Sequence, residues 1–209
     1  KRIYTSSILL FLFFLTIKSS FILVFTLIVL GVLSLLEFFN INKKILKNKS
    51  YLIISNLFFI IYVFLFCFMF LFFSNYIQLK IILFTLLFGC IASDIGGFVF
   101  GKILKGPKLI KISPNKTISG AVGSLLLTSI IMSISFFYFT ENFSYNILIV
   151  SIITSLACQS GDLFFSFIKR KAKIKDTGNF LPGHGGVLDR LDGIFFGIPL
   201  GFLALTLLY

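Results

Sequence analysis

Long apolar runs separated by short polar stretches dominate this sequence. Such runs are of the length that crosses the hydrocarbon core of a bilayer as a helix, about 17 to 25 residues, apart from a shorter one at the start. Lys18, Ser19 and Ser20 form the only polar break after that first run, which predicts a tight helical hairpin. We therefore expect an all-α, polytopic integral membrane protein of about seven helices. The predicted spans are 3–17, 19–39, 51–73, 76–98, 119–139, 146–168 and 193–209.

Composition agrees with this pattern. The chain is 58% hydrophobic, its mean hydropathy is +1.07 and only 12% of its residues are charged, whereas a soluble domain carries about 25% charged residues. We expect one transmembrane catalytic domain over 1–209, in which N-terminal helices (1–75) precede the catalytic part (76–209). The first apolar run has no small-residue cleavage site and is interpreted as a retained helix. Since the sequence begins with Lys1 rather than Met, a short N-terminal piece is expected to be missing.

The net charge of +12 would suggest a nucleic-acid partner in a soluble protein. Here the basic residues fall in short stretches beside apolar spans, so membrane orientation explains them and no nucleic-acid partner is expected. Seven spans would place the N-terminus and loops 40–50, 99–118 and 166–192 on one side, with 17 of the 19 Lys and Arg residues. Only Lys18 and Lys80 fall on the other side. The positive-inside rule then predicts a cytoplasmic N-terminus and an external C-terminus.

The acidic residues, like the basic ones, are concentrated in a small part of the sequence. Four of the seven lie between residues 159 and 193. Asp162 and, further upstream, Asp94 fall inside predicted helices, one or two turns from their cytoplasmic ends. A carboxylate at such depth is costly and usually faces the bundle interior with a partner. For each of these two, an ion pair with a loop lysine or a helix-packing contact is the alternative to a functional role.

Asp189 and Asp192 stand three residues apart at the start of the last span, which places both carboxylates on one face of a helix. Helix capping is the alternative, because Asp favours helix N-termini. Together with Asp162 they could converge at the cytoplasmic interface, where three carboxylates suit a hard cation such as Mg²⁺. No cluster of His or Cys competes for a softer metal.

Two loops carry candidate phosphate-binding groups. Ser113, Lys116 and Thr117 precede a helix that opens with Ser-Gly, an arrangement that can cradle a phosphate although it is not a Walker A sequence. The turn Pro-Gly-His-Gly-Gly (182–186) has glycines that let backbone amides approach a ligand, and His184 within it could equally be a satisfied turn histidine. The basic triplet 169–171 could simply hold anionic lipid headgroups.

The segment 166–192, called the signature segment below, resembles the signature of phosphatidate cytidylyltransferases (CDP-diacylglycerol synthases). The matching residues are Ser166, Lys169-Arg170, Lys175-Asp176, Gly178, Leu181-Pro182, His184-Gly185-Gly186 and Asp189-Arg190-Leu191-Asp192. The resemblance extends to 159–162, to Ser93-Asp94, to 113–117 and to the opening Arg-Ile-Tyr-Thr. Two departures are Ser119, where the family commonly has an acidic residue, and the small number of spans ahead of Asp94.

The resemblance implies that CTP and phosphatidate react to CDP-diacylglycerol and pyrophosphate, with Mg²⁺, and with room for a second cation. It implies a multi-pass enzyme of the inner (plasma) membrane, with its active site facing the cytoplasm, membrane lipids around it and a homodimer as one arrangement. Asp162, Asp189 and Asp192 match the metal-binding carboxylates. The residues implied to bind phosphates are Ser113, Lys116, Thr117, Lys169 and Arg170. Asp94, Ser166 and Arg190 complete the substrate-binding set, while Lys175, Asp176 and His184 shape or polarise the site.

Three other classes of protein fit less well. A transporter also holds carboxylates within its helices, but it does not need a glycine-rich histidine turn or so many lysines in two cytoplasmic loops. A CDP-alcohol phosphotransferase would carry a spaced four-aspartate helix motif, which is absent from this sequence. A non-catalytic scaffold leaves the concentration of charge unexplained.

Overall fold

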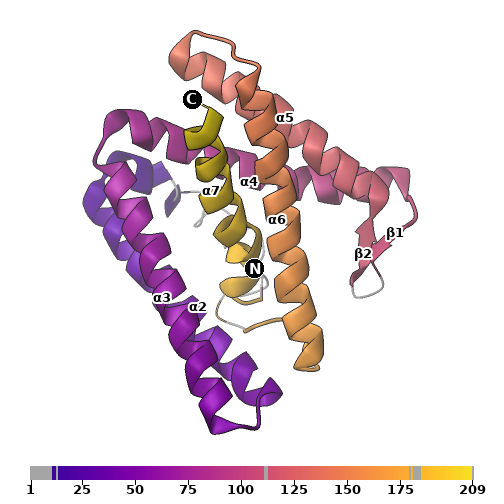
Figure 1. Cartoon of the computed structure of the whole chain (residues 1–209). Coiled ribbons are helices and arrows are strands. Elements are labelled where there is room, and N and C mark those ends of the chain that lie inside the picture. The colour runs from indigo at the N-terminus through magenta and orange to yellow at the C-terminus, as the bar shows by residue number, and fades with distance from the viewer. Residues whose placement is uncertain (1–10, 13, 111–112, 179, 181–184, 209) are drawn as a thin grey trace. The chain divides into compact units, whose positions relative to one another are not determined.

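The computed structural model describes residues 11–12, 14–110, 113–178, 180 and 185–208. The described part contains six helices long and apolar enough to cross a membrane and one two-stranded hairpin, so the protein is an all-α polytopic membrane protein. Figure 1 labels the elements. In chain order they are α2 (Ser20–Ile45), α3 (Lys49–Ser74), α4 (Ile77–Leu104), β1 (Lys108–Ile110), β2 (Ser113–Thr117), α5 (Ile118–Thr140), α6 (Asn146–Lys171) and α7 (Leu188–Leu208).

All six long predicted spans are confirmed as helices, but three of their boundaries move by five or six residues. α2 and α4 each continue six residues beyond the predicted end, and α7 begins five residues earlier. The added turns contain polar residues, which a helix tolerates at a membrane interface although they interrupt an apolar run. Residues 11–12 and 14–18 are helical too, and only Ser19 separates them from α2. The rest of the predicted first span, residues 3–10 and 13, lies outside the described residues.

The chain divides into two compact units. One comprises residues 1–74 and 168–191, and the other comprises 75–167 and 192–209. The signature segment from residue 168 onward therefore folds largely with the N-terminal helices, whereas the sequence grouped it with 76–209. The prediction of a single catalytic domain remains a prediction.

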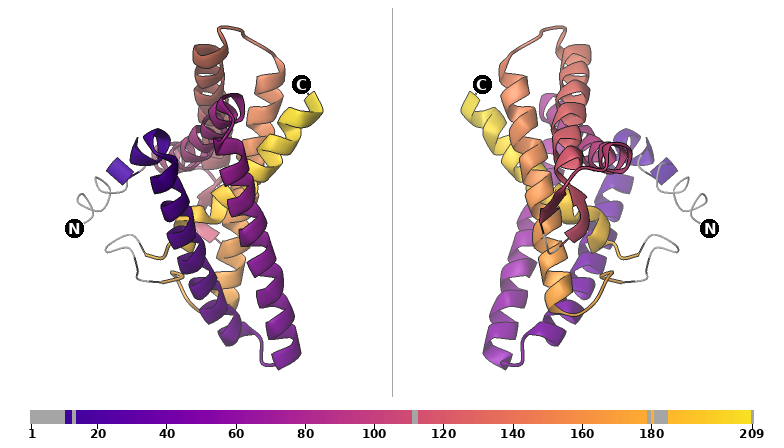
Figure 2. Two further views of the ribbon diagram at one scale, coloured as in Figure 1. Left: turned by 90° about the vertical axis from the view of Figure 1, so that its left-hand side faces the viewer. Right: turned by 90° about the vertical axis from the view of Figure 1, so that its right-hand side faces the viewer.

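In the first unit, α2 and α3 lie side by side as a helical hairpin with a connection of three residues, as the views of Figures 1 and 2 both show. The rings of Phe38 and Phe59 stack across it with centroids 3.8 Å apart. Near the connection, Asn42 Nδ2 donates to Ser55 Oγ (3.0 Å) and to Asn56 Oδ1 (2.9 Å). Polar side chains in a bilayer are stabilised by such interhelical hydrogen bonds, so these contacts fix the register of the hairpin.

In the second unit, α4 and α5 pack closely because glycines face each other. A Cβ on Gly96 would lie 2.6 Å from the carbonyl oxygen of Gly123, and one on Gly120 would lie 2.7 Å from that of Gly97. Small residues let transmembrane helices approach to backbone contact. Ser124 Oγ then reaches the carbonyl oxygen of Ser93 at 2.7 Å. The antiparallel pair β1–β2 lies at the shared end of the two helices (Figure 2).

Helix α7 uses glycines in the same way. Gly193, Gly197 and Gly201 recur every four residues on one face, where they meet Cys158 and Thr154 of α6. A methyl group on Gly197 would collide with the sulphurs of Cys158 and Cys90, so that position requires glycine. The described residues outside these contacts expose large apolar side chains such as Phe21 and Tyr138, about four-fifths exposed, as lipid-facing surfaces do.

The segment 99–118, which was predicted to be a loop, contains the end of α4, both strands and the first residue of α5. Its first residues complete α4, and the next residue, Lys105, caps the helix with a left-handed backbone (φ 43°). The β1–β2 hairpin follows, with Lys108 opposite Thr117 and Ile110 opposite Ser113. Strands this short leave no clear alternation in the sequence. The hairpin brings Lys116 and Thr117 directly to the N-terminus of α5.

Candidate functional site

Asp189 is the centre of the best-connected polar cluster in the first unit. It is the second residue of α7, and its Oδ1 accepts a hydrogen bond from Lys169 Nζ at 2.7 Å. Its Oδ2 accepts from the backbone N–H groups of Thr177 (2.9 Å) and Gly186 (3.1 Å). Charge-assisted hydrogen bonds of this kind are among the stronger ones in proteins. Asp189 thus ties the end of α6 to two points of the connection between α6 and α7, Thr177 and Gly186.

That connection, residues 172–187, is called the α6–α7 loop below. Its Gly185 has φ +83°, a left-handed conformation that favours glycine. A Cβ there would lie 3.2 Å from Asp189 Oδ2 and 3.7 Å from Asp176 Cβ. Gly185 thus lies close to these two acidic side chains, while the approach of a ligand to the turn remains a prediction. Residues 181–184, which include His184, lie outside the described residues.

A second carboxylate holds the same loop, and the sequence analysis did not single it out. Glu37 of α2 is 1% exposed. Its Oε1 accepts from Val187 N at 2.9 Å, and its Oε2 accepts from Leu188 N at 2.9 Å and Thr177 Oγ1 at 2.6 Å. The sequence did contain a signal, a lone acidic residue within an apolar run, which is a functional hypothesis by default in a membrane protein.

Asp192 follows Asp189 by three residues, and since both belong to α7 the predicted i, i+3 placement on one helix face is confirmed. Its side chain is 7% exposed, and Oδ1 lies 2.9 Å from Gly193 N. Asp189 accepts from the N–H of Gly186, two residues before the first residue of α7. The N–H groups that a helix start leaves unsatisfied are taken up at Val187 and Leu188 by Glu37.

In the second unit, Asp162 forms an ion pair with Lys116. Lys116 comes from β2 and Asp162 from the middle of α6, so the pair joins two of the predicted site segments. The alternative weighed for Asp162, an ion pair with a lysine of loop 99–118, is what the structure contains. The adjacent Gly161 packs against the carbonyl oxygen of Asp192. The backbones of α6 and α7 therefore approach closely next to Asp162 and at Asp192.

Asp162 and Asp94 lie deeper in their helices than expected. Nine residues follow Asp162 in α6, and ten follow Asp94 in α4, which is between two and three turns rather than one or two. The prediction was wrong because the polar final turns of both helices resembled loops in the sequence. Asp94 lies on an exposed face of α4. Its neighbour Ser93 is buried and bonds Ser155 of α6 at 3.2 Å.

Thr117 is the N-cap of α5. Its Oγ1 accepts from Gly120 N at 3.1 Å and lies 3.0 Å from Ser119 Oγ, which in turn accepts from Gly106 N at 3.2 Å. Ser119, where the resemblance led us to expect an acidic residue, thus anchors the turn before β1. These hydroxyls hold the hairpin against α5, and the N-terminus of α5 lies directly behind Lys116.

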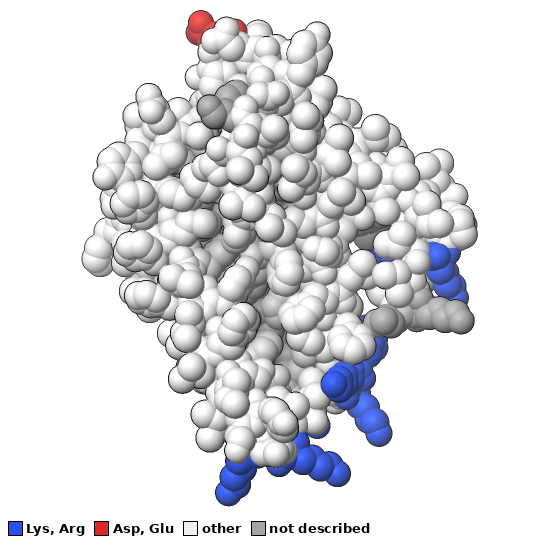
Figure 3. Space-filling view, viewed as in Figure 1, with Lys and Arg blue, Asp and Glu red and all other residues white. Residues whose placement is uncertain are grey.

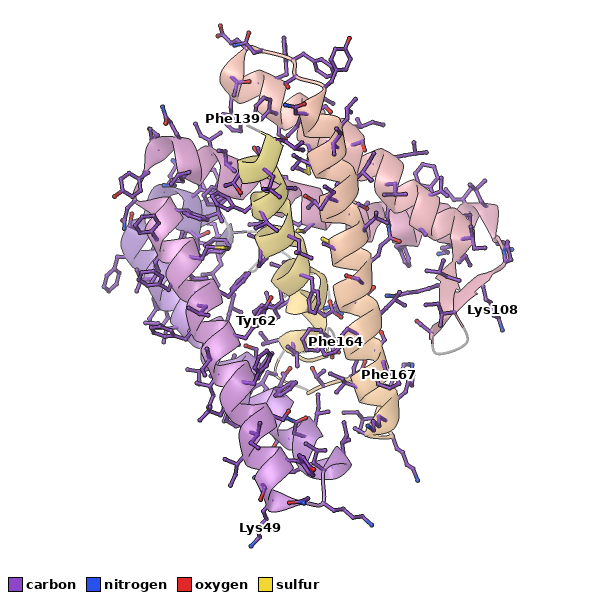
Figure 4. The ribbon with its side chains drawn as sticks, viewed as in Figure 1. Lys49, Tyr62, Lys108, Phe139, Phe164 and Phe167 are labelled. Atoms are coloured by element: carbon purple, nitrogen blue, oxygen red, sulfur yellow. The ribbon has the colours of Figure 1, made fainter. Side chains whose placement is uncertain are left out.

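The other predicted site residues are distributed along the same segments. Ser166 is buried in α6, and Ser113 begins β2. The exposed members are Arg170, Lys175, Asp176 and Arg190. On the face seen in Figure 3, the basic side chains gather at the ends of elements, around the hairpin, the end of α6 and the α2–α3 connection. Figure 4 shows Lys108 on β1 and Lys49 at the first residue of α3, both directed away from the ribbon.

The chemistry of these donors fits a hard divalent cation. Carboxylate oxygens are the ligands that Mg²⁺ prefers, and both Asp162 and Asp189 already hold a positive ammonium group. Among the described residues, no three His, Cys, Asp or Glu side chains are gathered closely enough to form a metal cluster.

Comparison with known proteins decides the family. The model of the Cytidylyltransferase family matches residues 2–208. The chain belongs to this family. It is 42% identical over 127 residues to the phosphatidate cytidylyltransferase of Rickettsia felis. The matched region covers 56% of this chain and 56% of the relative. It is 43% identical over 120 residues to that of Helicobacter pylori (57% of this chain, 45% of the relative). The first relatives are thus matched over about half of their length.

A longer match joins the chain to another member of the cytidylyltransferase family. The phosphatidate cytidylyltransferase of Rickettsia prowazekii is 35% identical over 198 residues, which cover 90% of this chain and 82% of the relative. The predicted resemblance is confirmed at the level of the family. Because the family model extends from residue 2 to residue 208, it includes the N-terminal helices and hence Glu37.

Proposed function

We propose that this member of the cytidylyltransferase family is a phosphatidate cytidylyltransferase, which converts CTP and phosphatidate into CDP-diacylglycerol and pyrophosphate. The observation that carries the proposal is the polar network of the signature segment, in which Lys169, Thr177 and Gly186 converge on Asp189. Family membership supports it, as do the names of the three relatives. We further propose that the protein lies in the inner membrane with this segment facing the cytoplasm, since 17 of 19 basic residues fall on that side.

The reaction needs little covalent work from the protein. A phosphate oxygen of phosphatidate bonds to the α-phosphorus of CTP, the bond from that phosphorus to the β-phosphate oxygen breaks, and pyrophosphate leaves with the electron pair. Catalysis of phosphoryl transfer rests on positioning and on stabilising charge. Lys116 and Lys169 supply ammonium groups for the phosphates, and the N-terminus of α5 behind Lys116 adds backbone dipoles that favour an anion.

We propose Asp162, Asp189 and Asp192 as the residues that would hold Mg²⁺. A bound Mg²⁺ would supply positive charge against the triphosphate. Lys116 pairs with Asp162 and Lys169 pairs with Asp189, so each of these two proposed ligands has beside it an ammonium group that could bind a phosphate. Ser113, Thr117, Ser166, Arg170 and Arg190 complete the proposed substrate-binding set with Asp94, and Lys175, Asp176 and His184 are proposed to shape it.

The test is transfer of label from α-labelled CTP into a lipid product by the purified protein in detergent with phosphatidate and Mg²⁺. We expect labelled lipid and stoichiometric pyrophosphate, and no transfer when diacylglycerol replaces phosphatidate. Glu141→Gln is a matched control, because Glu141 is an exposed acidic residue beyond the end of α5. No labelled lipid from a protein that is monodisperse and carries the native fold would overturn the proposal.

A further inference from the structure

Glu37 is the most deeply buried acidic side chain among the described residues, with 1% of its surface exposed. It lies eight residues before the end of α2, inside a helix of membrane-spanning length. An unpaired carboxylate there would be strongly unfavourable. Glu37 has no part in the signature segment, and neither of the two ion pairs among the described residues involves it. Its charge is instead offset by hydrogen-bond donors that come from far along the chain.

These donors lie 140 to 151 residues away in sequence. Two are the backbone N–H groups of Val187 and Leu188, at the start of α7, and the third is the hydroxyl of Thr177. The start of a helix leaves N–H groups without partners and carries the positive end of the helix dipole. A carboxylate from a different helix therefore does here what an N-cap side chain does locally.

Thr177 connects this carboxylate to Asp189. Its hydroxyl donates to Glu37 Oε2 at 2.6 Å while its backbone N–H donates to Asp189 Oδ2 at 2.9 Å. Space around the connection is tight. A Cβ on Gly178 would lie 2.5 Å from Glu37 Oε1, and one on Gly186 would lie 2.5 Å from Oε2. The two glycines of the signature thus make room for a side chain that is not itself in the signature.

We propose that Glu37 is a positioning residue, which pins Thr177 and the last residue of the α6–α7 loop to α2 and thereby fixes Asp189 for the reaction. It acts through Thr177 and through the start of α7, and it touches no substrate, because its oxygens are buried and occupied by the three donors. The inference rests on the proposed function for the role of Asp189. The pinning itself rests only on the contacts of Glu37.

Glu37→Gln is the decisive variant, because it keeps the size of the side chain but replaces one acceptor oxygen with an NH₂ group that faces donors. Removing a partner that orients a ligand residue typically lowers activity or metal affinity by about 10- to 100-fold. We expect such a fall in kcat, a higher Mg²⁺ requirement and a KM for CTP that changes less. Glu37→Asp, which keeps the charge, should recover part of the loss. Glu141→Gln removes an exposed acidic residue and should leave kcat unchanged.

A second pair of variants guards against failure of Glu37→Gln to fold. Thr177→Val removes only the hydroxyl donor, and Thr177→Ser retains it, while both keep the backbone N–H that Asp189 accepts. Thr177 is 8% exposed, so the two replacements sit in the same buried place. We expect Thr177→Val to lower kcat and Thr177→Ser to stay near the wild-type value.

Hydrogen exchange at the amides of Val187 and Leu188 gives a readout without activity. We expect at least about tenfold faster exchange in Glu37→Gln than in the wild type and Glu141→Gln, because N–H groups that lose a carboxylate acceptor are left to solvent. Unchanged exchange would overturn the pinning, and faster exchange with an unchanged kcat and Mg²⁺ requirement would overturn the positioning role. If wild-type protein forms no lipid product while exchange still responds to Glu37→Gln, the proposed function fails and the pinning stands.

Discussion

Single residues in this protein hold segments together by accepting several hydrogen bonds at once. Asp189 accepts from Lys169, Thr177 and Gly186, and Glu37 accepts from Thr177, Val187 and Leu188. Carboxylates suit this task since their two oxygens offer about four acceptor sites. The described residues at the start of α7 and at Thr177 are therefore held by charge and hydrogen bonds.

The metal proposal can be separated from a structural role at Asp162, Asp189 and Asp192. Exchange of each to Asn keeps the shape of the side chain but removes a negative charge from a cation's ligands. We expect turnover to collapse at limiting Mg²⁺ in Asp162→Asn and Asp192→Asn, with partial recovery at high Mg²⁺, while both variants stay monodisperse. Asp189→Asn should lose turnover and some thermal stability, because Asp189 also accepts two backbone N–H groups. Turnover near the wild-type value in all three variants would refute the proposal that these aspartates hold Mg²⁺.

Lys116 and Lys108 give a matched pair on the β1–β2 hairpin. Lys108→Ala removes an exposed ammonium group that points away from the ribbon, whereas Lys116→Ala removes the partner of Asp162 (Figure 4). A charge-assisted contact to phosphate contributes about 1.5 to 3 kcal/mol, so we expect the KM for CTP to rise roughly 10- to 150-fold in Lys116→Ala only. Steady-state kinetics at saturating phosphatidate provide the measurement. An unchanged KM and kcat in Lys116→Ala would remove the hairpin from the nucleotide site.

At the scale of elements, glycine positions decide how closely helices pack, and they differ in how much room they leave. A methyl group on Gly96 would meet the backbone of Gly123 and Ser124 at 2.6 to 3.0 Å. A methyl group on Gly31 of α2 would lie 3.5 Å from Cys67 and Val63, an ordinary contact distance. Backbone cannot move aside as a flexible side chain can, so of these two positions Gly96 is the one expected to reject a larger residue.

We therefore expect Gly96→Ala to destabilise the protein by about 1 to 3 kcal/mol through overpacking. Gly31→Ala should be neutral or slightly stabilising, since Ala favours a helix over Gly by about 1 kcal/mol. Thermal unfolding of the two variants in the same detergent, followed by circular dichroism, measures the difference. A midpoint for Gly96→Ala equal to that of Gly31→Ala would mean that α4 and α5 are not in backbone contact at this position.

The elements also show what the sequence could foretell. Apolar runs of about 20 residues predicted the helices from α2 to α7, since a helix of that length crosses a bilayer and satisfies its own backbone groups there. Their ends were misplaced by up to six residues, because the final turns of α2 and α4 carry lysines and glycines. The strands 108–110 and 113–117 lack the alternation of apolar and polar residues by which a strand is predicted from sequence. Glu37 was missed because its partners lie 140 residues or more away, a separation that local patterns do not report.

At the scale of the whole molecule, charged side chains lie mainly near the ends of the helices, and acidic and basic groups lie at different ends (Figure 3). In the second unit, acidic atoms lie at the α5–α6 connection and basic ones near the hairpin (Figure 3), at opposite ends of α5. A helix of 23 residues is about 35 Å long, enough to cross a hydrocarbon core of about 30 Å. The two ends of α5 therefore belong on opposite sides of the membrane, and the basic end should be cytoplasmic.

Labelling of single cysteines in intact cells tests this orientation. The background lacks Cys67, Cys90 and Cys158, and Cys is then introduced at Asn142, beyond the end of α5, or at Lys108, in the strand paired with the residue before α5. Both positions are exposed, and Lys108 is preferable to Lys105, whose left-handed backbone disfavours substitution. An impermeant maleimide should react at 142 in intact cells and at 108 only after permeabilisation. Reaction at 108 in intact cells would reverse the topology and separate the proposed site from cytoplasmic CTP.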